Sequence, residues 1–118
     1  MRVLWLAPYP HPFLDAAAHP VPWVGALADL LKHAPGVELT ILNWTPRLAG
    51  AVEEFDRDGI HFIYLRTPTV RHDILTLYRR RIALVRRYLR QHAHRYDLLH
   101  LHGSELQLPA MTAGLPVP

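Results

Sequence analysis

The chain opens on a short, unbroken apolar run, VLWLA from Val3 to Ala7, which ends at a Pro-Tyr-Pro sequence. Strands that are buried on both faces of a parallel sheet have this pattern. From Trp23 to Lys32 the apolar residues recur at three- and four-residue steps, which predicts a helix, and the alternating, β-branched segment Val37 to Leu42 predicts a second strand. A strand, a helix and a strand in this order predict a doubly wound α/β sheet.

The alternation of strands and helices continues along the chain. The apolar segments Ile60 to Leu65 and Leu98 to Leu101 predict two further strands. Between residues 43 and 59 the sequence mixes proline, glycine and charge, so we expect a loop with at most a turn of helix near Ala51 to Phe55. The long pattern from Asp73 to His94 predicts one continuous helix. We expect its apolar side chains to share one face: Ile74, Leu77 or Tyr78, Ile82, Val85 and Leu89.

The last segment predicts a helix over residues 106–113, which Ser104 could cap and Gly114 would end, and another strand opens at Leu115. The elements together predict a Rossmann-like, doubly wound α/β fold, with a mostly parallel sheet and helices on both faces. A chain of 118 residues is one domain at most. We expect it to stop after the fourth or fifth strand, before the sheet is complete.

The composition limits which cross-links, metal sites and membrane segments the chain can form. The sequence has no cysteine, which excludes disulfides and thiolate metal sites and leaves only histidines and carboxylates as metal ligands. The first apolar run stops at Pro8, so it is shorter than the core of a signal peptide, about 7–15 residues, and than the ~20 residues that span a bilayer. We therefore expect a cytoplasmic protein that does not span a membrane, with a peripheral position at the inner membrane face left open.

Ligands of doubly wound sheets bind where loops leave the carboxyl ends of the strands. Two loops qualify here: Pro8 to Pro22, which holds five prolines, and His102 to Glu105. The first could be a plain surface loop, or four of its side chains could contact a ligand: His11, Asp15, His19 and Trp23. No G-x-S-x-G, G-x-x-x-x-G-K or G-x-G-x-x-G pattern occurs, so a hydrolase elbow, a P-loop and a dinucleotide fingerprint are unsupported.

Four segments carry a resemblance to a known family: MRVLWLAPYP at the start, the junction GVELTILN, the stretch DLLHLHGSE from Asp97 to Glu105, and AGLPVP. They resemble the N-terminal domain of retaining GT-B glycosyltransferases of family 4, and DLLHLHGSE is the specific part. The resemblance implies a two-domain enzyme that transfers a sugar from a nucleotide-diphosphate sugar to an acceptor with retained configuration. Residues 1–118 would then be part of the acceptor-side domain, inactive without the C-terminal donor domain.

The resemblance also implies which residues form the site. His102 would be catalytic, at the cleft between the two domains. Six residues would bind substrate: Gly103, Ser104, Glu105, Pro8, Tyr9 and His19. The nucleotide sugar would be a substrate, with no cofactor and no metal, and the partners would be the donor domain and a small-molecule or lipid-linked sugar acceptor. One departure is that the usual Gly-Gly pair after the first strand is absent, because the only nearby glycine, Gly25, falls inside the expected helix.

Other interpretations of these residues stay open. His102 could be a strand-end histidine that is hydrogen-bonded to backbone. His100 and His102 lie two apart, on one side of a strand, and could ligate a metal together with a third residue. The whole chain could also be a stand-alone α/β binding or interaction module without catalysis.

Basic charge is concentrated between Arg71 and Arg95, where eight arginines accompany a single acid, Asp73. The stripe could be a solvated outer face of a helix, a nucleic-acid surface or a contact with an anionic membrane. Nucleic acid is disfavoured because few aromatic residues are interleaved with the arginines. The membrane contact would use five of them: Arg79, Arg80, Arg86, Arg87 and Arg90.

Overall fold

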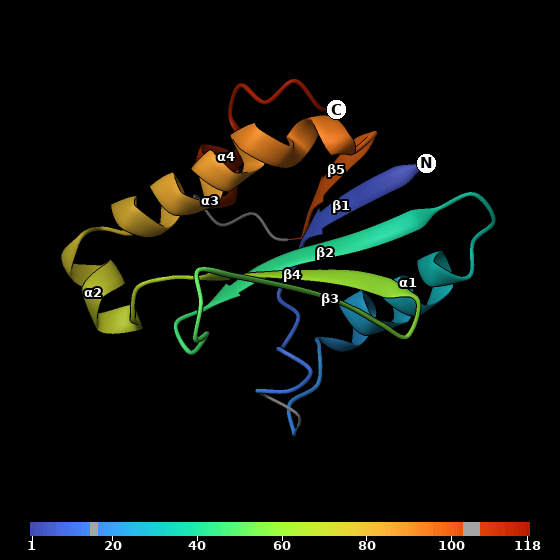
Figure 1. The fold of residues 1–118 in the computed structure, drawn as a ribbon, viewed down its shortest axis with the longest axis horizontal. Coiled ribbons are helices and arrows are strands. Elements are labelled where there is room, and N and C mark those ends of the chain that lie inside the picture. Colours follow the sequence, from blue (N-terminus) through green and yellow to red (C-terminus); the bar gives the residue numbers. More distant parts are fainter. Residues whose placement is uncertain (15–16, 103–106) are drawn as a thin grey trace.

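The computed structural model describes residues 1–14, 17–102 and 107–118 (Figure 1). Its strands are β1 (Arg2–Leu6), β2 (Glu38–Thr45), β3 (Val52–Arg57), β4 (Ile60–Arg66) and β5 (Leu98–Leu101). Its helices are α1 (Pro22–Lys32), α2 (Val70–Leu75), α3 (Arg79–His92), the 3-10 turn η1 (Ala93–Arg95) and α4 (Gln107–Thr112).

These strands form one sheet in the order β3-β4-β2-β1-β5, and only the β3–β4 pair is antiparallel. From β1 the chain builds outward through β2 to β4, and it then returns to place β5 on the other side of β1. The predicted Rossmann-like α/β class is confirmed. The reversal puts the topological switch point, where ligands of such sheets bind, between β1 and β5.

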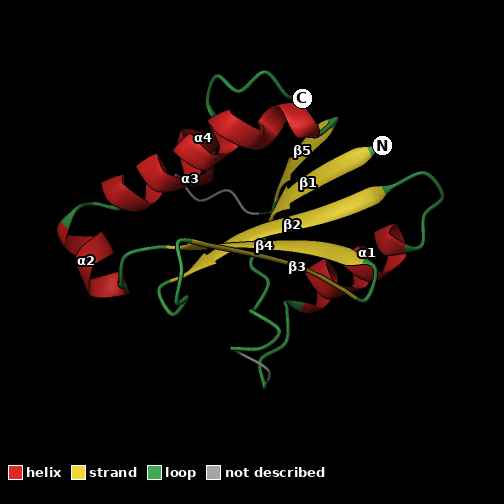
Figure 2. Ribbon diagram, in the orientation of Figure 1, coloured by secondary structure: helices red, strands yellow, loops and turns green. Residues whose placement is uncertain are grey.

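Helices cover both faces of the sheet (Figure 2). On one face, Val24 and Ala28 of α1 pack on a core that includes Trp5. On the other face, helices α3 and α4 pack on a core that includes Leu4 and Leu6. Successive residues of β1 therefore enter opposite cores, which is the physical reason that VLWLA is apolar throughout.

The expected loop with a turn of helix near residues 51–55 is wrong, because β3 occupies that segment as an edge strand. It forms a hairpin with β4 through Asp58 and Gly59, whose φ angles of 52° and 77° are those of a tight turn that favours glycine. The ring of Phe55 stacks on that of Phe62 at 5.5 Å. The acidic residues on either side of Phe55 are not buried. In sequence β3 therefore resembles a charged loop.

The single helix expected from Asp73 to His94 is also wrong. The chain forms α2 and α3 with a break at Leu77 and Tyr78, which both have left-handed φ angles, of 51° and 60°. Asp73 is fully buried and forms an ion pair with Arg81, which holds the end of α2 against α3. Because of the break, Ile74 and Leu77 are exposed rather than on the buried face, whereas Val85 and Leu89 are buried as predicted.

At the end of the chain, α4 stops at Thr112 and Gly114 follows with a φ of 74°, as predicted for a helix terminator. The proposed cap, Ser104, lies outside the described residues. No strand forms over 115–118, although the Leu99 amide donates to the Pro118 carbonyl at 2.7 Å. None of the helices in the described ranges has the length and apolarity that crossing a bilayer requires.

Candidate functional site

A cavity of about 230 Å³ opens at the carboxyl ends of β1, β2 and β5. Seven described residues line it: Leu6, Ala7, Pro8, Asn43, Trp44, His102 and Leu108. We call it the His102 cavity. It lies at the switch point of the sheet, and its walls are mostly apolar with few polar groups, which is the usual make-up of a small-molecule site.

His102 follows β5 and is only 5% exposed. Its backbone amide donates to the Leu6 carbonyl at 2.9 Å, which fixes it beside the end of β1. Its ring lies 4.2 Å from that of Trp5 and stacks at 5.3 Å on that of Trp23, at the start of α1. Among the described residues no group hydrogen-bonds its Nε2, which is itself buried, so this nitrogen is a polar atom whose hydrogen-bonding capacity is unused.

The environment keeps this imidazole neutral. Burial, aided by the neighbouring His100 ring at 4.2 Å, lowers the pKa of His102 to about 4. At neutral pH its side chain carries no charge, and Nε2 can accept a hydrogen bond or a proton, or donate a hydrogen bond in the other tautomer. It can therefore orient a hydroxyl group, whereas it cannot serve as a resident cation.

Asp97, the first residue of the DLLHLHGSE stretch, joins the start of β5 to the start of β1. The Asp97 carboxylate accepts the Arg2 backbone amide at 2.7 Å and also pairs with the Arg2 guanidinium at 3.3 Å. These bonds hold the pKa of Asp97 below its usual value. They tie β5 to β1 at the end of the sheet opposite His102, which helps to fix the register on which the site depends.

The predicted substrate-binding residues fall into separate groups. Pro8 lines the His102 cavity. Tyr9 and His19 instead line a second, more polar hollow beside α1, together with Asp29 and Lys32. The structure therefore does not bring His19 to His102. Three further residues, Gly103, Ser104 and Glu105, lie outside the described residues.

The proline loop is held to the sheet over its first residues. The Tyr9 carbonyl accepts hydrogen bonds from the Asn43 amide and from the Tyr64 hydroxyl, both at 2.9 Å. The same hydroxyl reaches the Pro10 carbonyl at 3.1 Å. Since the loop is anchored here, Pro8 keeps a fixed position at the cavity.

His11 is a second buried histidine, and it is 2% exposed. Its Nδ1 accepts the backbone amides of Phe13 and Leu14, each at 3.1 Å, and its Nε2 donates to the Glu53 carboxylate at 3.1 Å. Both ring nitrogens are therefore engaged inside the protein, and His11 holds the loop rather than facing a ligand. Asp15, which we had grouped with it, lies outside the described residues.

Of the seven cavity residues, sequence reasoning predicted only Pro8 and His102, and among those it missed, Asn43 and Trp44 have the largest polar or aromatic side chains. The second strand was expected to end at Leu42, but β2 continues to Thr45 and carries both residues to the carboxyl edge. Asn43 also bonds internally, because its Oδ1 accepts the Trp44 amide at 2.9 Å. Their only sequence signal was their place directly after an apolar run.

The rings of His100, in β5, and His102, just after it, lie close together, but the described part of the chain offers no third histidine, cysteine or carboxylate that completes a metal-binding group with them.

The arginines between Arg71 and Arg95 differ in exposure and in their partners. Arg86 is half-buried, and its guanidinium donates to the Ala110 carbonyl at 2.8 Å, which joins α3 to α4. Arg81 is held by Asp73. Four of the five arginines expected at a membrane remain exposed: Arg79, Arg80, Arg87 and Arg90.

Comparison with known proteins identifies no relative: no family model, no curated protein and no solved structure matches the chain.

Proposed function

We propose that this chain is the acceptor-side lobe of a retaining glycosyltransferase, which moves a sugar from a nucleotide-diphosphate sugar to an acceptor. The observation that carries the proposal is His102, a buried neutral histidine with an unpartnered Nε2, in a cavity at the switch point of the sheet. Histidine at this place is what the DLLHLHGSE resemblance implies. The resemblance and the geometry both support His102 as the residue to test.

The residues of the cavity suit a sugar. The free Nε2 can hydrogen-bond one hydroxyl, which orients the acceptor or the transferred sugar. Trp23 stacks on His102 and is itself more than half exposed, so its indole offers an apolar surface beside that polar atom. A sugar ring needs both kinds of contact, because its hydroxyls are polar and its C–H faces are apolar.

The proposal includes a donor domain that binds the phosphates of the nucleotide sugar. The loop after β1 lacks the Gly-Gly pair that the resemblance would lead one to expect there for phosphate contact. It also includes a cytoplasmic place of action, where nucleotide sugars are available, and a small or lipid-linked acceptor. No metal and no cofactor is required by the chemistry of this lobe.

The test is to incubate the full gene product with a panel of nucleotide-diphosphate sugars and sugar acceptors, and to follow nucleotide release and the anomeric configuration of the product by NMR. Transfer with retention supports the proposal, and transfer with inversion contradicts it. If sugars perturb the amides around His102 without any transfer, the chain is a binding module instead.

We also propose peripheral contact with an anionic membrane, because of an observation on α2. Four large apolar side chains on and after this short helix are each more than half exposed: Val70, Ile74, Leu75 and Leu77. The exposed arginines Arg71, Arg79 and Arg80 lie beside them in sequence. Apolar groups that enter a bilayer boundary and cations that meet anionic headgroups are the two parts of interfacial binding.

The membrane proposal predicts sedimentation with phosphatidylglycerol vesicles at low salt that is lost at about 0.5 M salt. Leu75→Ser should weaken the binding several-fold. Leu30→Ser is the matched control, because Leu30 is equally exposed but lies on α1, at the other end of the molecule (Figure 1). Equal effects of the two substitutions would contradict a specific role for α2.

A further inference from the structure

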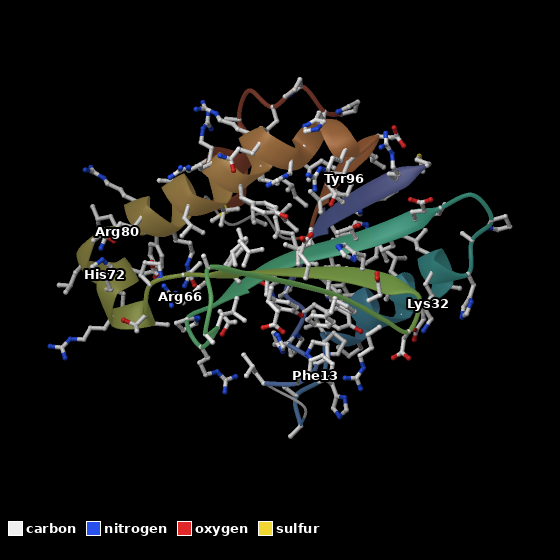
Figure 3. The ribbon with its side chains drawn as sticks, in the orientation of Figure 1. Phe13, Lys32, Arg66, His72, Arg80 and Tyr96 are labelled. Atoms are coloured by element: carbon white, nitrogen blue, oxygen red, sulfur yellow. The ribbon has the colours of Figure 1, made fainter. Side chains whose placement is uncertain are left out.

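A second opening on the carboxyl side of the sheet lies where β4 leads into α2, with α3 alongside. It has a volume of about 480 Å³, and its wall includes Arg66, Thr67, Thr69, His72, Arg80 and Leu84. We call it the Arg66–Arg80 hollow. Figure 3 shows Arg66, His72 and Arg80 gathered at the α2 end of the molecule. None of these residues has a part in the function proposed above, apart from the general charge of Arg80.

The two arginines are not neutralised. Arg66 donates to the Ala49 carbonyl at 3.1 Å, and Arg80 donates to the His72 Nε2 at 3.0 Å, so both use neutral acceptors. None of the described residues that line the hollow is a carboxylate, and none of the described carboxylates forms an ion pair with either guanidinium. The nearest acid in sequence, Asp73, is buried and held by Arg81. Each guanidinium keeps donors that are free for an anion.

Thr67 adds an unused hydroxyl to the same wall. The residue is 5% exposed, and its Oγ1 finds no hydrogen-bond partner among the described residues. A buried hydroxyl without a partner costs free energy, about 1–3 kcal/mol. A ligand that accepts this hydrogen bond would remove the cost.

We propose that the Arg66–Arg80 hollow binds a phosphate group, the dianionic end of a phosphomonoester. Two guanidinium groups match the charge of a dianion, and their planar donors match its oxygens. The Thr67 hydroxyl is buried in the wall, and a turn of its side chain toward the hollow lets it donate to a third oxygen. This assignment rests on residues separate from His102 and does not depend on the glycosyltransferase proposal.

The place of the hollow says what the rest of the ligand can reach. Arg66 is the last residue of β4 and pairs in register with Thr45 of β2, whose neighbour Trp44 lines the His102 cavity. Neighbouring strands lie about 4.8 Å apart, so β4 and β1 are separated by roughly 10 Å. A phosphorylated molecule of modest size can therefore hold its phosphate in the hollow and extend along the edge toward His102.

The test is a titration of the isotopically labelled protein with glycerol 3-phosphate, followed by amide chemical shifts. We expect the largest shifts at Arg66, Thr67, His72 and Arg80, and we expect Arg80→Gln to weaken Kd at least ~10-fold. Arg90→Gln is the matched control, an exposed arginine of the same helix outside the hollow. Equal weakening in both variants would mean general charge attraction and would overturn the site.

Thr67→Val keeps the assignment falsifiable if an arginine variant unfolds. It replaces the hydroxyl with a methyl group of similar size, so the thermal midpoint should stay the same or rise, while Kd weakens several-fold. Unchanged affinity would remove Thr67 from the site. Unchanged affinity in Arg66→Gln and Arg80→Gln as well would overturn the proposal.

A parallel experiment separates the two sources of such a phosphate, a soluble metabolite and a lipid headgroup. Vesicles of phosphatidic acid present a phosphomonoester, whereas phosphatidylglycerol presents a diester. Dependence on Arg80 with glycerol 3-phosphate assigns a soluble ligand, and dependence only with phosphatidic acid assigns a lipid. Dependence with neither contradicts the phosphate site, whatever the outcome of the sugar-transfer assay.

Discussion

Two histidines are buried to a similar extent, His11 in the loop after β1 and His102 directly after β5. Their hydrogen bonding differs. His11 has both ring nitrogens bonded, to two backbone amides and to Glu53. His102 has aromatic rings around it, and its Nε2 has no partner in the described part of the molecule. The two histidines are therefore alike in burial and differ in their hydrogen bonds, and that difference supports the proposal that His102 meets a ligand.

The two histidines should also differ in their effect on the free energy of unfolding. Hydrogen bonds at His11 are part of what stabilises the loop, so losing them leaves buried groups unpaired. The unpartnered nitrogen of His102 works against folding, because a buried polar atom without a partner is unfavourable. This unfavourable nitrogen is the observation behind the proposal that His102 meets a ligand.

The largest expected effect is that of replacing each histidine by leucine. His11→Leu should lower the free energy of unfolding by about 2–4 kcal/mol, because the amides of Phe13 and Leu14 lose their acceptor. His102→Leu should change it by about 1 kcal/mol or less. Urea unfolding of the two variants measures both. A larger loss for His102→Leu than for His11→Leu would break the comparison.

The second largest effect should be the loss of stability at acidic pH that is due to His102. Since the pKa of His102 is near 4 in the fold and near 6.5 in an unfolded chain, the unfolded state binds its proton first as pH falls. Wild type should therefore lose stability between pH 6.5 and pH 4, by at most about 3 kcal/mol from this residue, with no contribution above pH 6.5. His102→Leu should show a shallower decline in thermal midpoint over that window. Parallel curves for the two proteins would contradict the lowered pKa.

A smaller effect is expected for the loop anchor. Tyr64→Phe removes the hydroxyl that donates to the Tyr9 and Pro10 carbonyls and should cost about 1–2 kcal/mol. Tyr9→Phe is the control, because the Tyr9 contribution to this contact is its backbone carbonyl. Hydrogen exchange at residues 9–14 should rise in the first variant only. A rise in both would mean that the Tyr9 hydroxyl also anchors the loop, because Tyr9→Phe keeps the ring that packs 5.1 Å from Phe62.

Much of the fold was predictable from sequence. The apolar runs of β1, β4 and β5 and the helical period of α1 gave the sheet class, and the position of His102 directly after an apolar run placed it at the carboxyl edge. β3 was missed because an edge strand needs only one apolar face, so its charges hid the alternation, although Asp58-Gly59 was a hairpin signal.

Other features depend on contacts between distant residues. The break between α2 and α3 has two non-glycine residues in the left-handed region, and it accompanies the buried ion pair of Asp73 with Arg81, which no local pattern contains. The course of the proline loop is set by bonds to Asn43, Glu53 and Tyr64, at least 34 residues away. Those bonds hold the start of the loop, directly after Pro8, which lines the His102 cavity.

The most direct test of the central claim is to measure sugar-transfer turnover and the free energy of unfolding together in His102→Leu of the full gene product. The account predicts a loss of turnover of ~100-fold or more, with stability within about 1 kcal/mol of wild type. Unchanged turnover, or a loss of turnover matched by a loss of folding, would contradict it.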